Sequence, residues 1–303
     1  MSAVNAEIKK RIETFEAMPA LCQFLVEHLN DPTVDLQFLA DQLRYDPGMT
    51  TNVLKVANSA LYGGREPSSS VQSAIARLGM KQLFQMVVAV GISKTLKRRM
   101  FGYQLEPEEL LVHSVYVAVA SEEIAKTLGL HTSEMLFTAG LLHDVGKILL
   151  DDYVCKEWAT LSARFRTTTA AFDSVEQEVL GICHAEAGAA LLKKWKFPEE
   201  LVVAVRWHHR PAEAGDWMST ANIVHIADIL SYSEGIGTGV DGMRYKISRD
   251  AISSLGLRPK TIEAVASHSL DKVRELSEIL SGAQTAPPPK PPSTARRKDG
   301  PYR

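Results

Sequence analysis

The sequence predicts an all-α fold, and three observations support this prediction. Apolar residues recur at helical spacing through almost the whole chain, as they do on the buried face of an amphipathic helix. No stretch shows a convincing alternation of apolar and polar residues, which would mark a half-buried strand. The composition is globular, with 45% hydrophobic and 23% charged residues, and 303 residues can bury one large core or two smaller ones.

Two short amphipathic patterns open the N-terminal part. Leucine and phenylalanine fall at i, i+3, i+4 and i+8 over residues 21–29, and residues 36–43 repeat the pattern, so both segments are expected to be helices. Residues 80–99 contain few turn signals, and the sequence EPEE at 106–109 resembles a helix start. We therefore place a boundary near residue 103, between an N-terminal helical part (residues 1–103) and a larger helical domain (residues 104–284).

Four further helices are predicted in the larger domain. One covers residues 111–128 and ends at Gly129, since glycine commonly follows a helix end. A second should run from 133 to 150, with Ser133 as its N-cap. A third lies between Pro198 and Pro211, and a fourth covers residues 218–232.

The composition changes abruptly at Thr285. Residues 285–303 are rich in proline, arginine and lysine and contain few apolar residues to bury, so this tail is expected to be disordered. Its basic charge could contact an acidic partner, but a solubilising end is the simpler interpretation.

Charge and cysteine content indicate a soluble, cytoplasmic protein. The net charge of −2 gives no reason to expect binding to nucleic acid or to a membrane. Three cysteines without a CxxC pair suit a reducing compartment, where Cys22, Cys155 and Cys183 would be small buried apolar residues. The N-terminus lacks the apolar core of a signal peptide, and the longest apolar run, residues 86–92, is too short to span a bilayer.

The sharpest local feature is the pair His143-Asp144, followed by Lys147, inside an apolar helical stretch. Polar groups in such a setting need a partner because burial removes their hydration. Lys147 lies three residues after Asp144, hence on the same helical face, where it could hold a phosphate. Asp144 has two carboxylate oxygens and could bridge two metal ions.

Further imidazole and carboxylate groups are available as partners. Asp228 also lies among apolar residues. With the pair above, the candidate metal ligands are His113, His143, Asp144, His184, His208, His209 and Asp228. Such a set suits iron, manganese, zinc or nickel rather than calcium. Each histidine taken alone could equally be a hydrogen-bonded core or surface residue.

The remaining histidines are assigned outside this set. His28, His131 and His268 are expected at the surface. His225, one turn before Asp228, could support a ligand from behind.

The order His113, His143-Asp144, Asp228 resembles the HD phosphohydrolase superfamily, which implies that these four groups hold one divalent metal. His184 and His208-His209 are similar to groups of the HD-GYP phosphodiesterases, which implies a second metal shared through Asp144. Glu109 stands where some HD-GYP members have a further ligand, although a solvated helix start is the simpler interpretation. No Gly-Tyr-Pro follows His209, which argues against hydrolysis of cyclic di-GMP.

A closer resemblance is to HDOD, the HD-related output domain. The motifs DPGMT at 46–50, LKVANSALYG at 54–63 and SAIARLG at 73–79 resemble its N-terminal part. GLLHDVGK at 140–147 and WHHRP at 207–211 resemble its second half. MPAL at 18–21 resembles the beginning of the domain. The similarity covers roughly residues 15–235. Within it, the NSALYG motif could cap a turn between helices or contact a ligand, and we favour the architectural role.

Two functions follow from this resemblance. The first is a bacterial signal-transduction output module that docks on response regulators, kinases or cyclic-dinucleotide enzymes. It would have a mononuclear or dinuclear site for a divalent transition metal. Iron is favoured over manganese, nickel or zinc. The second is a metal-dependent phosphohydrolase acting on a nucleotide or cyclic dinucleotide, in which Asp144 and Lys147 would be the catalytic residues.

Overall fold

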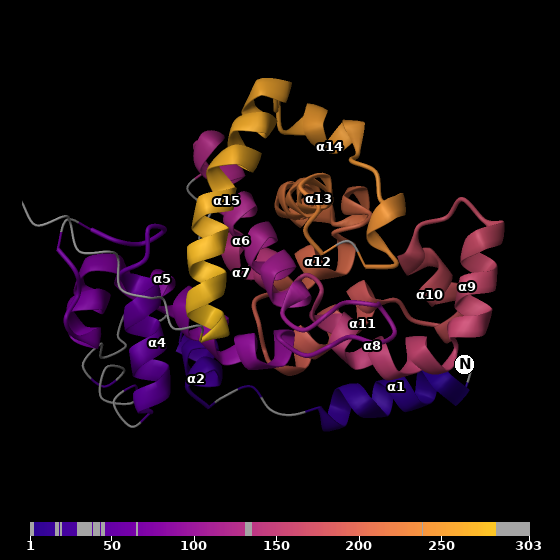
Figure 1. Ribbon diagram of the computed structural model, residues 1–303, viewed down its shortest axis with the longest axis horizontal. Helices are drawn as coiled ribbons and strands as arrows, with labels where there is room; N and C mark the ends of the chain where they lie inside the picture. The colour runs from indigo at the N-terminus through magenta and orange to yellow at the C-terminus, as the bar shows by residue number, and fades with distance from the viewer. Residues whose placement is uncertain are drawn as a thin grey trace, which may run out of the picture.

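The computed structural model describes residues 3–15, 18, 20–28, 38, 43, 46–64, 66–130, 135–237 and 239–282. Within these ranges the chain is helical and contains no strand, only an isolated antiparallel bridge between Met100 and Leu105 (Figure 1). The all-α prediction is therefore confirmed. Most of the expected helix at 36–43, the expected cap Ser133, the histidine at 131 and the tail from 285 lie outside the described residues.

The N-terminal part contains α1 (Ala3–Thr14), α2 (Ala20–His28), α4 (Pro47–Ala57) and α5 (Val71–Leu96). The DPGMT motif starts α4, because the Asp46 side chain accepts a hydrogen bond from the Met49 amide and proline occupies the first turn. In the NSALYG turn, the Asn58 side chain donates to the Ser68 carbonyl and accepts from the Ser68 amide, as a turn-forming residue would.

Helix α5 is the one described helix whose length and composition would allow it to cross a membrane. Half of its most apolar stretch is buried inside the protein, as in the core helix of a globular fold. The backbone of α5 is also interrupted at Gly79, where φ is +83° and ψ is 175°. Glycine adopts this conformation at low cost because it has no Cβ.

The larger part contains ten α-helices among the described residues. They are α6 (Glu109–Thr127), α7 (Leu136–Leu142), α8 (Val145–Lys156), α9 (Trp158–Thr167), α10 (Phe172–Leu180), α11 (His184–Lys194), α12 (Glu199–Trp207), α13 (Met218–Ser233), α14 (Arg249–Ser254) and α15 (Pro259–Ser281). Central helix α6 packs against α7, α13 and α15, while α11 packs against α8 and α12 (Figure 1). Two elements join the parts: α1 lies along α8 and α11, and α15 also contacts α4 and α5.

The helix expected over residues 133–150 is in fact two helices, α7 and α8. The break falls at Asp144, whose φ of −101° and ψ of 9° leave the α-helical range. Neighbouring residues of an unbroken helix project about 100° apart. The change of direction instead lets His143 and Asp144 face one common centre.

Two glycines beside this break allow close helix packing. A Cβ on Gly140 would lie 2.7 Å from the Val117 backbone of α6, and a Cβ on Gly146 would lie 1.9 Å from the carbonyl oxygen of His184. The glycines of the GLLHDVGK motif therefore bring α6 and α11 to the His143-Asp144 turn.

Candidate metal centre

All seven predicted ligand residues converge on one buried centre. His113 comes from α6, His143 and Asp144 from the turn between α7 and α8, His184 from the start of α11, His208 and His209 from the end of α12, and Asp228 from α13. Six of these side chains are at most 1% exposed, and that of His209 is 5% exposed. The structure thus brings together every residue of the predicted set.

We call His113, His143 and Asp228 the first ligand group. One ligand atom from each lies within 4.8 Å of the other two. The Nε2 atoms of His113 and His143 are 3.1 Å apart. The Asp228 Oδ1 atom lies 3.4 Å from Nε2 of His113 and 3.6 Å from Nε2 of His143.

We call His184, His208 and His209 the second ligand group, and their ligand atoms satisfy the same 4.8 Å limit. The Nε2 atoms of His184 and His209 are 3.0 Å apart. This group contains imidazoles alone.

Asp144 lies between the two groups. Its Oδ2 atom is 3.3 Å from Nε2 of His113 and 3.4 Å from Nε2 of His143. Its Oδ1 atom is 3.4 Å from Nε2 of His184 and 3.9 Å from Nε2 of His208. One carboxylate oxygen therefore faces each ligand group, which is the arrangement that a bridging carboxylate requires.

Hydrogen bonds fix the tautomers of the first ligand group. His143 Nδ1 lies 2.7 Å from the Gly140 carbonyl, which can only accept, so this nitrogen carries the hydrogen. The Ser231 hydroxyl donates to the Asp228 carbonyl at 2.7 Å, so its oxygen accepts the hydrogen of His113 Nδ1 at 3.0 Å. Metal binding requires the neutral imidazoles, and in that form both Nε2 atoms are lone-pair acceptors that point toward the centre.

The second ligand group is held in the same manner. His208 Nδ1 donates to the Val205 carbonyl at 2.7 Å, and His184 Nδ1 donates to Glu176 Oε2 at 2.6 Å. Orientation of a ligating histidine through its other nitrogen is typical of metal sites.

Other polar atoms of the centre have no hydrogen-bond donor within the part of the chain that the structure describes. Asp144 Oδ1, both Asp228 carboxylate oxygens, His208 Nε2 and His209 Nδ1 are buried without a hydrogen-bond partner. Lone pairs that face one another at about 3 Å repel unless a proton or a metal cation lies between them. The donor set therefore fits divalent transition metals, which accept imidazole and carboxylate together.

The pKa values reflect the crowding of these groups. Burial, reinforced by the nearby His143, lowers the pKa of His208 to about 3, and burial also holds the pKa of His209 well below its ordinary value. Burial lowers the pKa of His143 as well, but the charge of Asp144 outweighs it and raises that pKa to about 10. For Asp144, burial is outweighed by the Lys147 and His143 charges, so its pKa is lowered.

Sequence reasoning missed the residues behind the ligands. Glu176 of α10 accepts hydrogen bonds from both the backbone and the ring of His184, and from the Tyr103 hydroxyl at 2.5 Å. A buried glutamate in a short amphipathic helix gives no local signal of this role. His225 donates to the His208 carbonyl at 2.8 Å and accepts from the Ser248 amide at 3.0 Å, so it supports a ligand as the sequence suggested.

Lys147 is buried at 1% exposure. Its ammonium lies 2.6 Å from Asp144 Oδ2 and 2.6 Å from Asp241 Oδ2. The buried carboxylates raise the pKa of Lys147 although burial alone would lower it. Its charge is therefore already neutralised by two carboxylates.

A segment that follows α13 covers the ligand groups. The Tyr245 ring stacks on His209 with centroids 3.9 Å apart and planes at 8°. Tyr232, in the last turn of α13 itself, stacks on His113 with centroids 5.2 Å apart. Gly237, with φ of +67°, lies so close to His113 that a Cβ would be 2.6 Å from the histidine Cβ. The Lys147–Asp241 ion pair fastens the same segment to α8.

The cysteines and the histidines outside the ligand groups differ in their exposure to solvent. Cys22 and Cys183 are buried, but Cys155 is exposed, so its predicted burial was wrong. The cause is its position near the end of α8, on the face turned to solvent. His268 is exposed and His28 half-buried. Exposed Glu109 accepts a hydrogen bond from the Glu106 amide at the start of α6, at 2.7 Å.

Comparison with known proteins agrees with the all-helical fold. A crystal structure of an HDOD domain protein from Geobacter sulfurreducens is similar to this chain, with 25% identity, a TM-score of 0.74, and coverage of 91% of this chain and 97% of that one. A structure of a "Putative phosphohydrolase" from Shewanella amazonensis SB2B has the same fold, with 22% identity, a TM-score of 0.69 and coverage of 92% and 98%.

A curated relative, an uncharacterised protein of Treponema pallidum, is 24% identical over 211 residues. The match covers 67% of this chain, which spans about two fifths (39%) of the relative's length. The HDOD domain family matches residues 16–211, more than half of the sequence. Together with the HD-type arrangement of histidines and aspartates, this shows that the chain belongs to the HDOD family.

Proposed function

We propose that this protein is a signal-transduction module whose HD-type centre holds two divalent transition-metal ions, iron first among them, with Asp144 as the bridge. The observation that supports this proposal most is the set of buried ligand atoms without hydrogen-bond partners, described above. The first ligand group would hold one ion and the second the other, with one oxygen of Asp144 toward each.

In the proposed role, the metal stabilises a scaffold that other signalling proteins recognise. The buried carboxylates and imidazoles would destabilise the core without a cation, so metal binding is coupled to folding. Docking on response regulators, kinases or cyclic-dinucleotide enzymes is the corresponding output. Pull-down with the immobilised full chain from the source cells, compared with metal-stripped protein, tests the output; equal recovery of partners without metal would contradict this role for the metal.

A metal-dependent phosphohydrolase is the second candidate, and the complete ligand set favours it. Metals bound in such a centre lower the pKa of a coordinated water and stabilise charge on phosphoryl oxygens. The residues of this chain oppose access to it: Lys147 is paired with two carboxylates, and Tyr245 covers His209. We therefore expect the protein, with Lys147 paired and His209 covered in this way, not to hydrolyse phosphate esters.

Two measurements separate these functions. Elemental analysis of protein purified without added metal should report close to two transition-metal ions per chain, and less than about 0.1 equivalent after reconstitution would rule out both metal-based roles. A panel of nucleotides and cyclic dinucleotides should then remain intact. Hydrolysis by the metal-loaded protein that disappears in Asp144→Ala would instead establish the enzyme.

A further inference from the structure

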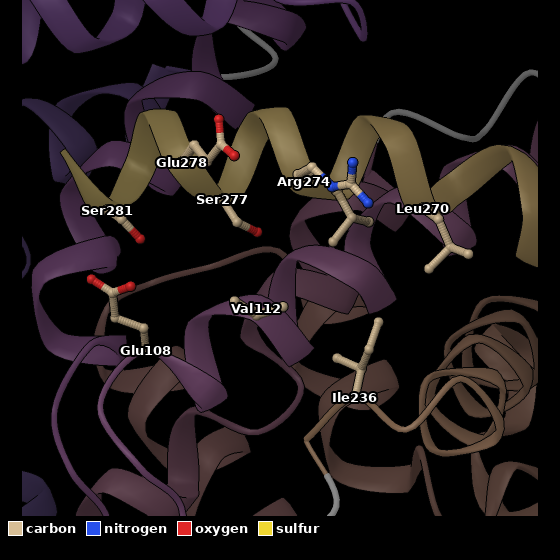
Figure 2. A pocket seen from close by; sticks show the side chains of 9 residues that line it. Glu108, Val112, Ile236, Leu270, Arg274, Ser277, Glu278 and Ser281 are labelled. Atoms are coloured by element: carbon tan, nitrogen blue, oxygen red, sulfur yellow. The ribbon is translucent and has the colours of Figure 1, made fainter. Parts of the chain in front are cut away.

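A second candidate site lies on another face of the protein, between α15 and the start of α6. It is a groove of about 410 Å³, within the size range of small-molecule pockets. Figure 2 shows α15 along one side, with Val112 of α6 and Ile236 opposite. None of its lining residues belongs to the two ligand groups.

The middle of the groove offers two hydrogen-bond donors. Ser277 is 7% exposed, and its hydroxyl has no hydrogen-bond partner among the described residues. In Figure 2 this hydroxyl points from α15 into the groove. Arg274 lies three residues earlier, hence on the same helical face, and no described residue forms an ion pair with its exposed guanidinium. Together they can hold one carboxylate group.

One end of the groove is acidic. Glu108 and Glu278 line it, and neither carboxylate forms an ion pair with a described residue. Figure 2 shows Glu108 directed across the groove toward Ser281. Ser281 lies four residues after Ser277 on α15, a separation of about 6 Å. Because Glu108 is directed toward Ser281, an ammonium group near Glu108 would lie within about one helical turn of a carboxylate held at Ser277.

The other end of the groove is apolar. Leu270, 38% exposed, faces Ile236 across it (Figure 2). Val112 and Val273 also line the groove. Along α15 the order is therefore an apolar surface, an anion-binding pair and an acidic end.

We propose that this groove binds a free apolar α-amino acid of about the size of leucine. The aliphatic side chain would contact Leu270 and Ile236, the carboxylate would accept from Arg274 and Ser277, and the ammonium group would face Glu108. A fatty acid would satisfy the first two features but would leave the acidic end unmatched. The complementary charges at two points of one groove select a zwitterion.

The position of the groove connects it with the metal centre. Val112 precedes His113, and Ile236 precedes Gly237, which packs against His113. The binding site itself does not depend on bound metal, so its test and that of the metal centre can fail separately.

Isothermal titration of the full chain with L-leucine tests the proposal. We expect saturable binding of one molecule per chain, weakened about tenfold or more by Arg274→Met because a charge-assisted hydrogen bond is lost. Ser277→Ala and Glu108→Gln should each weaken binding several-fold. Lys260→Met removes an exposed charge from the same helix outside the groove and should leave binding unchanged.

Two analogues test the zwitterion. 4-Methylpentanoate lacks the ammonium group and isoamylamine lacks the carboxylate, so both should bind at least about tenfold more weakly than leucine. The proposal is overturned if neither L-leucine nor L-phenylalanine binds saturably below about 10 mM. Equal affinity for 4-methylpentanoate, or unchanged leucine affinity in Arg274→Met with an unaltered thermal melt, would overturn it as well.

Discussion

The two ligand groups of the buried centre place their negative charge differently. In the first, the carboxylate of Asp228 is itself a ligand candidate, and the histidines are oriented by neutral acceptors, the Ser231 hydroxyl and the Gly140 carbonyl. The second has imidazoles alone, and its charge lies one hydrogen bond behind His184, on Glu176. Apart from the shared carboxylate of Asp144, charge compensation for a cation is thus direct in the first group and relayed through an imidazole in the second.

This difference has consequences for the metals that each group would accept. A carboxylate with two imidazoles suits manganese, iron and zinc, whereas three imidazoles favour softer transition metals and disfavour magnesium. Asp144 is the element that the two groups share, so changes there should affect both, and changes elsewhere should affect one.

The largest effect is expected for Asp144→Ala. Its carboxylate contributes an oxygen to each group, so metal content should fall from about two equivalents to below about 0.2. Inductively coupled plasma mass spectrometry of the purified proteins measures this. Asp271→Ala, an exposed aspartate on α15, is the matched control. Retention of one full equivalent in Asp144→Ala would show that the carboxylate is not shared.

A smaller, selective loss is expected when one group alone is changed. Asp228→Ala should remove the ion of the first group, and His209→Ala should remove the ion of the second, so each variant keeps about one equivalent. His268→Ala changes an exposed histidine and should keep both ions. Loss of both ions in both variants would mean that the two groups act as one site.

Glu176→Gln should weaken the second group without abolishing it. The substitution keeps the shape of the side chain but removes the negative charge that His184 faces. Changes of this kind cost about 10–100-fold in metal affinity, measurable by competition with a chromophoric chelator. Glu178→Gln, on the exposed side of the same helix, serves as the control. Equal weakening of both ions would contradict the assignment of Glu176 to the second group.

The smallest effect is expected for the aromatic cover. Tyr245→Ala removes the ring stacked on His209 and should speed metal release to a chelator a few-fold, with a small change in affinity. Tyr245→Phe keeps the ring and loses only the hydroxyl that accepts from the Asp173 amide, so release should remain slow. Stopped-flow measurement of metal release in the two variants separates the effect of the ring from that of its hydroxyl hydrogen bond. Equal release rates in Tyr245→Ala and Tyr245→Phe would contradict the covering role of the ring.

The cluster of histidines and aspartates could be predicted from the sequence because its members sit in local motifs. His143-Asp144 and Asp228 stand out as polar residues within apolar stretches, and a histidine pair such as His208-His209 is visible by itself. The helices followed from apolar periodicity, since that period reports which face is buried. The interruption at Asp144 was missed because glycine contacts with other helices, not local propensity, allow it.

The partners of the ligands could not be predicted. Lys147 was expected to hold a phosphate because its spacing places it beside Asp144, but its second partner, Asp241, lies 94 residues further along the chain. The contact of Glu176 with Tyr103 spans 73 residues. Such contacts depend on how helices pack, and a single sequence carries no spacing rule for them.

Anomalous diffraction from crystals of the metal-loaded protein would locate the bound ions. We expect two anomalous peaks, one beside each ligand group, with the Asp144 carboxylate between them. A single peak, or two peaks that both lie away from Asp144, would contradict this expectation.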